Sequence, residues 1–255
     1  MKKRKLKFGL LILFIAIVCG LVWAGDFLSF QPMPEAIKAL ESDEQVTVNR
    51  VFVPGWLNYY YVFEPTAAKP AKGFIIYPGA LVDPGVYAPT ARRIAAKGYR
   101  TILVSMPFNL AIFGYRRADT IMKNYPEIKK WALGGHSLGG AMACRYAKNF
   151  STKTSGVVLW AAYPSETFRI DDLDINAISI YGTEDDRIPT DDIETSKLHL
   201  PQNTQFVQID GGNHIQFGWY DDGKEYQKGD GLAQITRERQ QDIVVKSTTD
   251  FLEQI

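Results

Sequence analysis

Cysteine is nearly absent from this chain, which has two among its 255 residues, Cys19 and Cys144. One lies in an apolar stretch near the amino terminus and the other in a predicted helix, so the sequence predicts no structural disulfide. An excess of either charge is also missing, since the formal net charge is +1. That balance excludes the strongly basic surface typical of nucleic-acid-binding domains, and we expect no nucleic-acid partner. Internal repeats and low-complexity stretches are lacking too, which argues against a solenoid.

Long hydrophobic runs are missing with one exception, residues 8–24, which follow the basic segment 1–7. A run of about 17 apolar residues is at the short limit of a membrane-spanning helix. We expect an uncleaved signal-anchor, with the basic residues in the cytoplasm and the remainder of the chain extracytoplasmic at the cell membrane. The alternative is cleavage after Ala24, which would make the protein secreted.

The remaining sequence predicts one globular domain, because its apolar content is high enough for a large core. We assign residues 1–25 to the basic segment and anchor, 26–44 to a linker with a short helix, and 45–255 to the domain. Within it, strands alternate with helices, which predicts an α/β fold with a doubly wound, mostly parallel sheet of about eight strands and helices on both faces. The predicted strands lie near residues 46–53, 57–63, 74–77, 100–105, 130–134, 156–161, 177–181 and 205–210. The predicted helices lie near 87–97, 115–124, 140–147 and 231–252.

The motif Gly135-His136-Ser137-Leu138-Gly139 reads G-x-S-x-G and lies between a predicted strand and a predicted helix. A serine on such a sharp turn adopts a strained backbone and needs small residues two positions away on either side. The turn also presents the hydroxyl at the amino end of a helix, where a developing negative charge is stabilised. Ser137 is therefore a predicted nucleophile.

A nucleophilic serine needs a base, and histidine is scarce enough for every candidate to be weighed. The chain has three histidines, His136, His199 and His214. His136 adjoins Ser137 on a strained turn, so its ring should point away and be packed with hydrogen bonds, whereas His199 lies at a solvated helix end. His214 follows a predicted strand on the loop Gly211-Gly212-Asn213, at the sheet edge where doubly wound proteins place functional groups. His214 is the predicted base.

An acid that orients the base is expected between Ser137 and His214 in this architecture. The predicted strand 177–181 is followed by Gly182-Thr183-Glu184-Asp185-Asp186, which leaves the same sheet edge. Adjacent acids on a turn are often only a solvated loop. Asp185 is the preferred candidate because it comes three residues after the glycine that ends the strand, and Asp186 is the alternative.

The order serine, acid, histidine, each on a loop after a strand, resembles the α/β-hydrolase superfamily from about residue 45 onward. The segment His214-Ile215-Gln216-Phe217-Gly218, with Tyr226 to Gly231, is similar to a compact, lidless bacterial group described as dienelactone-hydrolase-like. True dienelactone hydrolases carry a cysteine nucleophile. This chain has Ser137 in that position, so the resemblance does not imply that it acts on the same substrate.

The resemblance also implies two backbone donors for an oxyanion hole. The first would be the N–H of Leu138, directly after the nucleophile. The second would come from Pro78-Gly79-Ala80-Leu81, which follows the strand near 74–77, and Ala80 is the candidate. Family members often have His-Gly-x there, and Pro78 takes the place of the histidine. A plain β-turn at Pro78-Gly79 is the alternative.

These residues predict a serine hydrolase that cleaves a carboxylic ester or a related acyl bond through an acyl-enzyme, with no metal or organic cofactor. Its substrate would be a small molecule or an acyl group presented at a surface. The same residues would serve an acyltransferase, a thioesterase or a peptidase. A non-catalytic binding protein on the same fold is a further alternative.

The connection over residues 162–176 is too short for a helical lid, which predicts an open site and a preference for short acyl groups. Aromatic residues on loops near the predicted site could line an acyl groove. They are Tyr87, Phe108, Phe113, Phe217 and Trp219. We also expect the catalytic domain to remain active after deletion of residues up to about Phe30.

Overall fold

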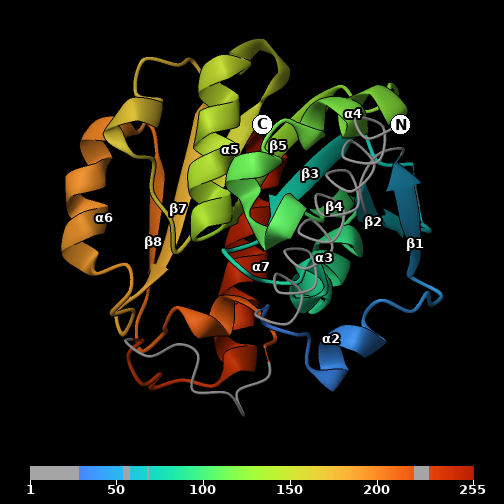
Figure 1. The fold of residues 1–255 in the computed structure, drawn as a ribbon, viewed down its shortest axis with the longest axis horizontal. Helices are drawn as coiled ribbons and strands as arrows, with labels where there is room; N and C mark the ends of the chain where they lie inside the picture. Colours follow the sequence, from blue (N-terminus) through green and yellow to red (C-terminus); the bar gives the residue numbers. More distant parts are fainter. Residues whose placement is uncertain (1–28, 54–57, 68, 221–229) are drawn as a thin grey trace, which may run out of the picture.

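The computed structural model describes residues 29–53, 58–67, 69–220 and 230–255 (Figure 1). Its centre is one eight-stranded sheet in the order β1-β2-β4-β3-β5-β6-β7-β8, which confirms the predicted doubly wound architecture. The strands are β1 (Val46–Val53), β2 (Asn58–Pro65), β3 (Lys72–Tyr77), β4 (Arg100–Val104), β5 (Lys130–His136), β6 (Gly156–Trp160), β7 (Asn176–Gly182) and β8 (Gln205–Ile209).

The sheet is parallel from β4 to β8, and the hairpin of β1 and β2 joins it antiparallel at one edge. The central strands β3 to β7 are buried along almost their whole length. Such strands appear in a sequence as short apolar runs, which is why they could be predicted. Residues 54–57, between β1 and β2, lie outside the described residues.

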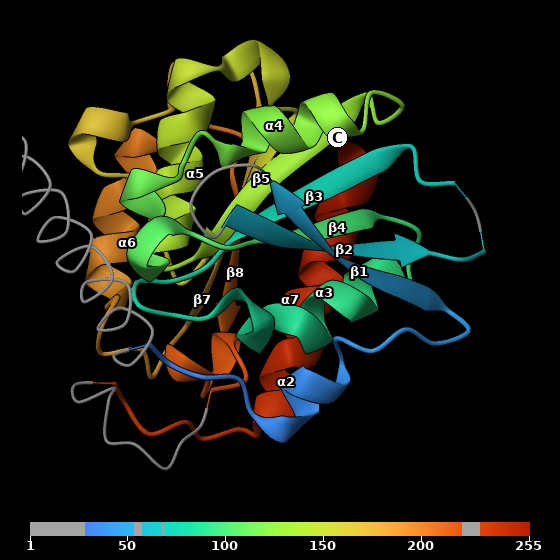
Figure 2. The ribbon, with the colours of Figure 1, turned by 45° about the vertical axis from the view of Figure 1, so that its right-hand side comes forward.

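Helices cover both faces of the sheet (Figures 1 and 2). Helices α3 and α7 pack in one apolar cluster, and α4 and α5 pack in a second cluster on the other face. Since β3 leads to α3 and the adjacent β5 leads to α5, neighbouring strands send their chains to opposite faces. The chain therefore leaves the carboxyl ends of these two strands toward opposite faces, which is the place in a doubly wound sheet where functional groups gather. The helices are α2 (Pro34–Lys38), α3 (Ala88–Ala95), α4 (Arg117–Asn124), α5 (Leu138–Asn149), α6 (Thr190–Ser196) and α7 (Arg237–Gln254).

The predicted start of the last helix was wrong, because α7 begins at Arg237 and not near Gly231. The side chain of Thr236 accepts a hydrogen bond from the backbone N–H of Arg239, which caps the helix there. Gly231 lies outside the helix, where its carbonyl accepts a hydrogen bond from the Asn213 side chain at 2.8 Å. The residues before α7 thus pack on the loop that carries His214.

Part of the predicted linker is packed against the domain. Ala36 in α2 is fully buried, and α2 lies against the 3-10 turn η1 (Pro84–Tyr87). Phe30 forms a parallel bridge with Val82, donating to the carbonyl of Leu81 and accepting from the N–H of Asp83.

The predicted anchor, residues 8–24, lies outside the described residues. Among the helices of the described part of the chain, none is both long and apolar enough to cross a membrane.

Candidate active site

Ser137 occupies the sharp turn between β5 and α5. Its φ of 53° and ψ of −123° place a non-glycine residue in a conformation that L-residues rarely adopt. Its N–H donates to the carbonyl of Trp160 at 3.0 Å, which ties the turn to β6. The side chain is half-buried, whereas the preceding His136 is buried. The strained turn therefore leaves the serine accessible at the carboxyl edge.

The glycines on either side of Ser137 allow the turn to sit against β3. A Cβ on Gly135 or on Gly139 would come within 2.2 Å of the carbonyl oxygen of Tyr77. Real Cβ atoms do not approach backbone that closely, so any larger residue would push the nucleophile turn away from β3. The packing thus holds Ser137 next to Pro78 and Gly79, the residues before the candidate donor Ala80.

The two predicted oxyanion donors lie on the loops that follow β3 and β5. Leu138 is the first residue of α5, where backbone N–H groups have no partner within the helix. Ala80 is exposed on the turn after β3. Within the described part of the chain, neither N–H donates to a backbone carbonyl. Leu81, next to Ala80, has a φ of 56° and is held by a hydrogen bond from its N–H to the carbonyl of Asn109.

The side chains of Asp185 and His214 meet in the interior. The distance from Asp185 Oδ2 to His214 Nδ1 is 2.8 Å, and both side chains are almost completely buried. The other carboxylate oxygen, Oδ1, accepts from the backbone N–H groups of Arg187 and Ile188. The carboxylate is therefore fully engaged and fixed in orientation. Asp186, the alternative acid, is exposed.

Close glycine contacts bring the loops of Asp185 and His214 together. A Cβ on Gly182 would lie 2.2 Å from the carbonyl oxygen of Gly212, so the two loops touch through their backbones. That carbonyl accepts from the N–H of Glu184 at 2.8 Å. The glycines at these positions therefore set the spacing between the acid and the imidazole.

Asp230 is a residue of the site that sequence reasoning missed. Its carboxylate accepts from the backbone N–H groups of His214 and Ile215, and so anchors the loop at the histidine itself. Burial raises the pKa of Asp230, against the effect of these two hydrogen bonds. Asp230 lies in the segment Tyr226 to Gly231 that carries the resemblance, but the sequence assigned it no role, because its role depends on a backbone contact across 16 residues of sequence.

His136 is buried and hydrogen-bonded, as its sequence context indicated. Its Nδ1 lies 2.9 Å from the hydroxyl of Tyr87 and 3.1 Å from that of Tyr220. Burial, with a smaller contribution from the nearby His214, holds the pKa of His136 well below its usual 6.5. The rings of His136 and His214 have centroids 4.3 Å apart. The predicted base therefore lies beside the residue that precedes Ser137.

The five residues of the proposed aromatic lining differ in how far they are buried. Tyr87 and Phe217 are fully buried, so the expectation that they face a groove was wrong. Phe217 stacks on His136, with centroids 5.6 Å apart and an interplanar angle of 15°. Phe108 and Phe113 are exposed, by 40% and 60%, and pack edge to face. Trp219 is half-buried.

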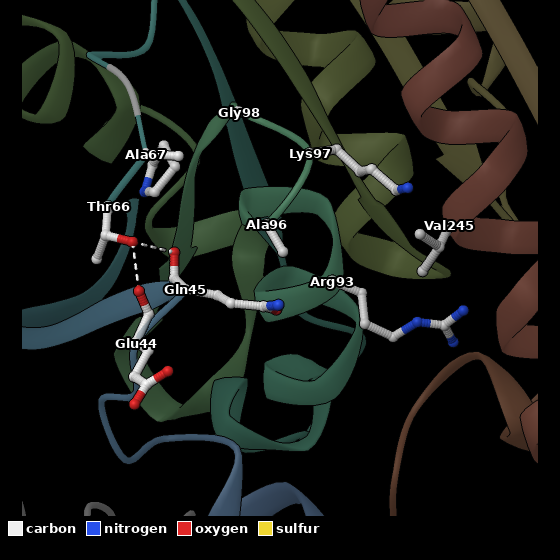
Figure 3. A pocket seen from close by; sticks show the side chains of 10 residues that line it. Glu44, Gln45, Thr66, Ala67, Arg93, Ala96, Lys97, Gly98 and Val245 are labelled. Carbon is white, nitrogen blue, oxygen red and sulfur yellow. Dashed lines mark hydrogen bonds between the residues drawn. The ribbon is translucent and has the colours of Figure 1, made fainter.

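A surface hollow of about 740 Å³ lies at the other edge of the sheet (Figure 3). It is bordered by Thr66 after β2 and by Gly98 before β4, close to the amino ends of the parallel strands. The candidate catalytic residues all follow carboxyl ends. This hollow is therefore separate from them.

Comparisons with solved structures identify proteins that share the fold. They include a putative dienelactone hydrolase from Klebsiella pneumoniae subsp. pneumoniae (TM-score 0.62, 15% identity, covering 82% of this chain and 99% of that chain). A dienelactone hydrolase from Anabaena variabilis has a TM-score of 0.60 at 13% identity, over 82% of this chain and 97% of that chain. MGS-M1, an alpha/beta hydrolase enzyme from a Medee basin deep-sea metagenome library, has a TM-score of 0.57 at 18% identity. That match covers 83% of this chain and 100% of that chain.

No curated protein sequence matches this chain. Residues 73–242, in contrast, match the sequence profile described as the Alpha/beta hydrolase family. The matched region begins within β3 and ends within α7, so it includes the nucleophile turn and the loops of Asp185 and His214. The chain therefore belongs to the alpha/beta hydrolase family.

Proposed function

We propose that this protein is a serine hydrolase that cleaves a carboxylic ester, with Ser137 as nucleophile, His214 as base and Asp185 as the acid that orients the base. The observation that carries the proposal is the buried 2.8 Å contact between Asp185 and His214. The ring of His214 lies beside that of His136, which directly precedes the serine of a strained strand-to-helix turn. An acid, an imidazole and an accessible serine are the three parts that this chemistry needs.

In the proposed reaction, His214 takes the proton of the Ser137 hydroxyl while the serine oxygen attacks the acyl carbon. Nδ1 of His214 faces Asp185, so the other ring nitrogen, Nε2, is the atom that takes this proton. Asp185 then stabilises the imidazolium. The imidazolium returns the proton to the departing alcohol, which leaves an acyl-serine. Water, deprotonated by the same imidazole, releases the acid and restores the serine.

Negative charge on the carbonyl oxygen is proposed to be stabilised by the N–H groups of Leu138 and Ala80. Leu138 is at the amino end of α5, which is 12 residues long and adds the favourable end of its dipole. The strained φ of Leu81 and its bond to Asn109 support a fixed loop at Ala80.

An exposed apolar patch next to this site suggests where an acyl group binds. Phe108, Ile112 and Phe113 are each at least 39% exposed on the segment after β4. The short turn η3 (Ala111–Phe113) packs against α5, and Asn109 binds the backbone next to Ala80. The patch thus borders both proposed oxyanion donors. Two of the proteins with a similar fold are named as dienelactone hydrolases, and a lactone is a cyclic ester. These names favour an ester as the substrate of this chain too, although its nucleophile would be serine.

The amino-terminal segment is proposed to anchor the enzyme in the cell membrane, with the catalytic domain extracytoplasmic. Support comes from the basic residues before the apolar run 8–24. Its substrate would then be a small molecule or an acyl group at the cell surface.

Labelling with a fluorophosphonate probe tests the nucleophile without knowledge of the substrate. We expect the probe to modify Ser137, and Ser137→Ala to abolish both labelling and ester turnover. Ser165→Ala, at an exposed serine on the loop after β6, is a matched control that should label as the wild type does. Labelling or turnover that persists in Ser137→Ala would overturn the proposed mechanism.

A further inference from the structure

A fully buried cluster of polar side chains lies behind the proposed catalytic residues. It consists of Tyr87, His136 and Tyr220, which come from the end of η1, the end of β5 and the segment after η7 (Ile215–Phe217). The two hydroxyls are 2.9 Å apart, and both are within 3.1 Å of His136 Nδ1. The Tyr87 hydroxyl also accepts from the backbone N–H of Gly79 at 3.1 Å.

The hydrogen atoms in this cluster can be assigned by counting. Burial raises the pKa of both tyrosines, so both keep their protons. Gly79 and the two hydroxyls then supply three hydrogens, and the acceptors are the two hydroxyl oxygens and Nδ1 of His136. All three hydrogens are satisfied only if Nδ1 is unprotonated. His136 is therefore neutral, with its ring proton on Nε2, an atom that has no hydrogen-bond partner among the described residues.

The cluster lies beside three parts of the proposed active site, the oxyanion loop, the nucleophile turn and the ring of His214. Gly79 directly precedes Ala80, the proposed oxyanion donor. His136 directly precedes Ser137, and its ring lies between those of His214 and Phe217, at 4.3 Å and 5.6 Å between centroids. The ring of Tyr220 also packs on Phe30, which pairs with the strand-like segment after Ala80.

We propose that Tyr87, His136 and Tyr220 are positioning residues, which hold the oxyanion loop in register with Ser137 and His214. This inference rests on the proposed function. Buried polar side chains cost folding free energy wherever a polar atom lacks a hydrogen-bond partner, as Nε2 of His136 does among the described residues. An apolar cluster would fill the same space without that cost. The polar cluster instead orients the backbone. The Tyr87 hydroxyl gives the Gly79 N–H a fixed acceptor. This contact restricts the orientation of the next peptide group, which carries the Ala80 N–H.

Tyr87→Phe separates this role from simple packing. The variant leaves the Gly79 N–H without its acceptor but keeps the ring, so the oxyanion loop should lose its orientation. Because an oxyanion donor acts mainly in the transition state, kcat should fall by roughly 10- to 100-fold while KM stays nearly constant. Affinity for a trifluoromethyl ketone, which forms a tetrahedral adduct on the serine, should fall by a similar factor.

Tyr220→Phe provides a second, milder variant, since it keeps the contact between Gly79 and Tyr87. We expect a loss in kcat of less than about 10-fold, again without a change in KM. Tyr99→Phe is the control: Tyr99 is also buried, and its hydroxyl contacts the carbonyl of Thr249, away from the site. All variants are assayed with p-nitrophenyl acetate at a temperature at which their melting curves show them to be folded.

The outcomes distinguish the two proposals. If the wild type is labelled by fluorophosphonate and Tyr87→Phe keeps wild-type kcat and ketone affinity, the positioning role is overturned and the serine mechanism stands. A fall in kcat no larger than that of Tyr99→Phe would overturn it as well. If Tyr87→Phe does not fold, Tyr220→Phe decides by the same criteria. An unlabelled wild type would overturn the proposed function, and the positioning role with it.

Discussion

Two adjacent aspartates differ sharply in their surroundings, and the difference can be tested. Asp185 is buried against His214, whereas Asp186 is exposed. We expect Asp185→Asn to lower kcat by roughly three to four orders of magnitude, because the amide no longer stabilises the imidazolium or holds its tautomer. Asp186→Asn is the matched control and should change kcat little. Steady-state kinetics that gave the reverse order would assign the role to Asp186.

The buried His136 should make the fold sensitive to acid. Burial lowers its pKa well below 6.5 in the folded state, whereas in the unfolded chain it titrates near its ordinary value. Below about pH 6.5 the unfolded state therefore binds an extra proton, and stability falls as the pH falls. Between about pH 7 and about pH 5.5 this single group should cost on the order of 1 kcal/mol of stability.

His136→Gln removes that titration. In urea denaturation, its free energy of unfolding should fall less than that of the wild type over this acidic interval, by the amount just given. Between about pH 7 and about pH 8.5 the two proteins should show parallel curves, because the imidazole is neutral in both states there. If the free energy of unfolding fell equally with pH in the two proteins, His136 would bind a proton in the folded state as readily as in the unfolded chain.

At the scale of the elements, the strands were predicted better than the loops. Buried parallel strands such as β5 and β7 leave short apolar runs in the sequence, and the motif around Ser137 marks the turn after β5. The start of α7 was missed because the residues before Arg237 pack on the loop of His214. That contact is tertiary and has no local signal.

The same limit applies to the candidate site. The residues that come from motifs, Ser137, His214 and Asp185, were all proposed from the sequence. Asp230, and the hydrogen bonds of Tyr87 and Tyr220, were not, because each joins residues distant in the chain. An isolated tyrosine in a sequence carries no mark that distinguishes a hydrogen-bonding role from packing.

At the scale of the whole molecule, the structure indicates how many amino-terminal residues can be removed without loss of activity. Deletion of residues 1–25 should release the protein from the membrane fraction and leave activity intact. Deletion of residues 1–30, which the sequence alone suggested would be harmless, should impair kcat, since Phe30 holds the backbone of Leu81 and Asp83 beside the oxyanion loop. The full-length protein should resist salt and alkali washing of membranes, with its domain open to external protease. A mature protein that begins at Gly25 and appears in the medium would instead show a cleaved signal.

Substrate size is also set by the architecture as a whole. The connection between β6 and β7, which the structure describes completely, forms a single short 3-10 turn, η5 (Glu166–Phe168), rather than a helical cover. The exposed patch of Phe108, Ile112 and Phe113 offers apolar contact beside the proposed site without enclosing it. We therefore expect p-nitrophenyl esters of short acyl chains, up to roughly eight carbons, to be hydrolysed faster than long ones, since only the first carbons gain contact.

Phe113→Ala should lower kcat/KM for an octanoyl ester more than for an acetyl ester, because the acetyl group is too short to reach the patch. Phe52→Ala, at an exposed aromatic on β1, is the matched control and should leave both values unchanged. Because the connection between β6 and β7 forms no helical cover, the rate should rise smoothly as the substrate passes its solubility limit. A sudden rise at that limit, or an optimum at long acyl chains, would show that a closed and hydrophobic binding site forms over Ser137.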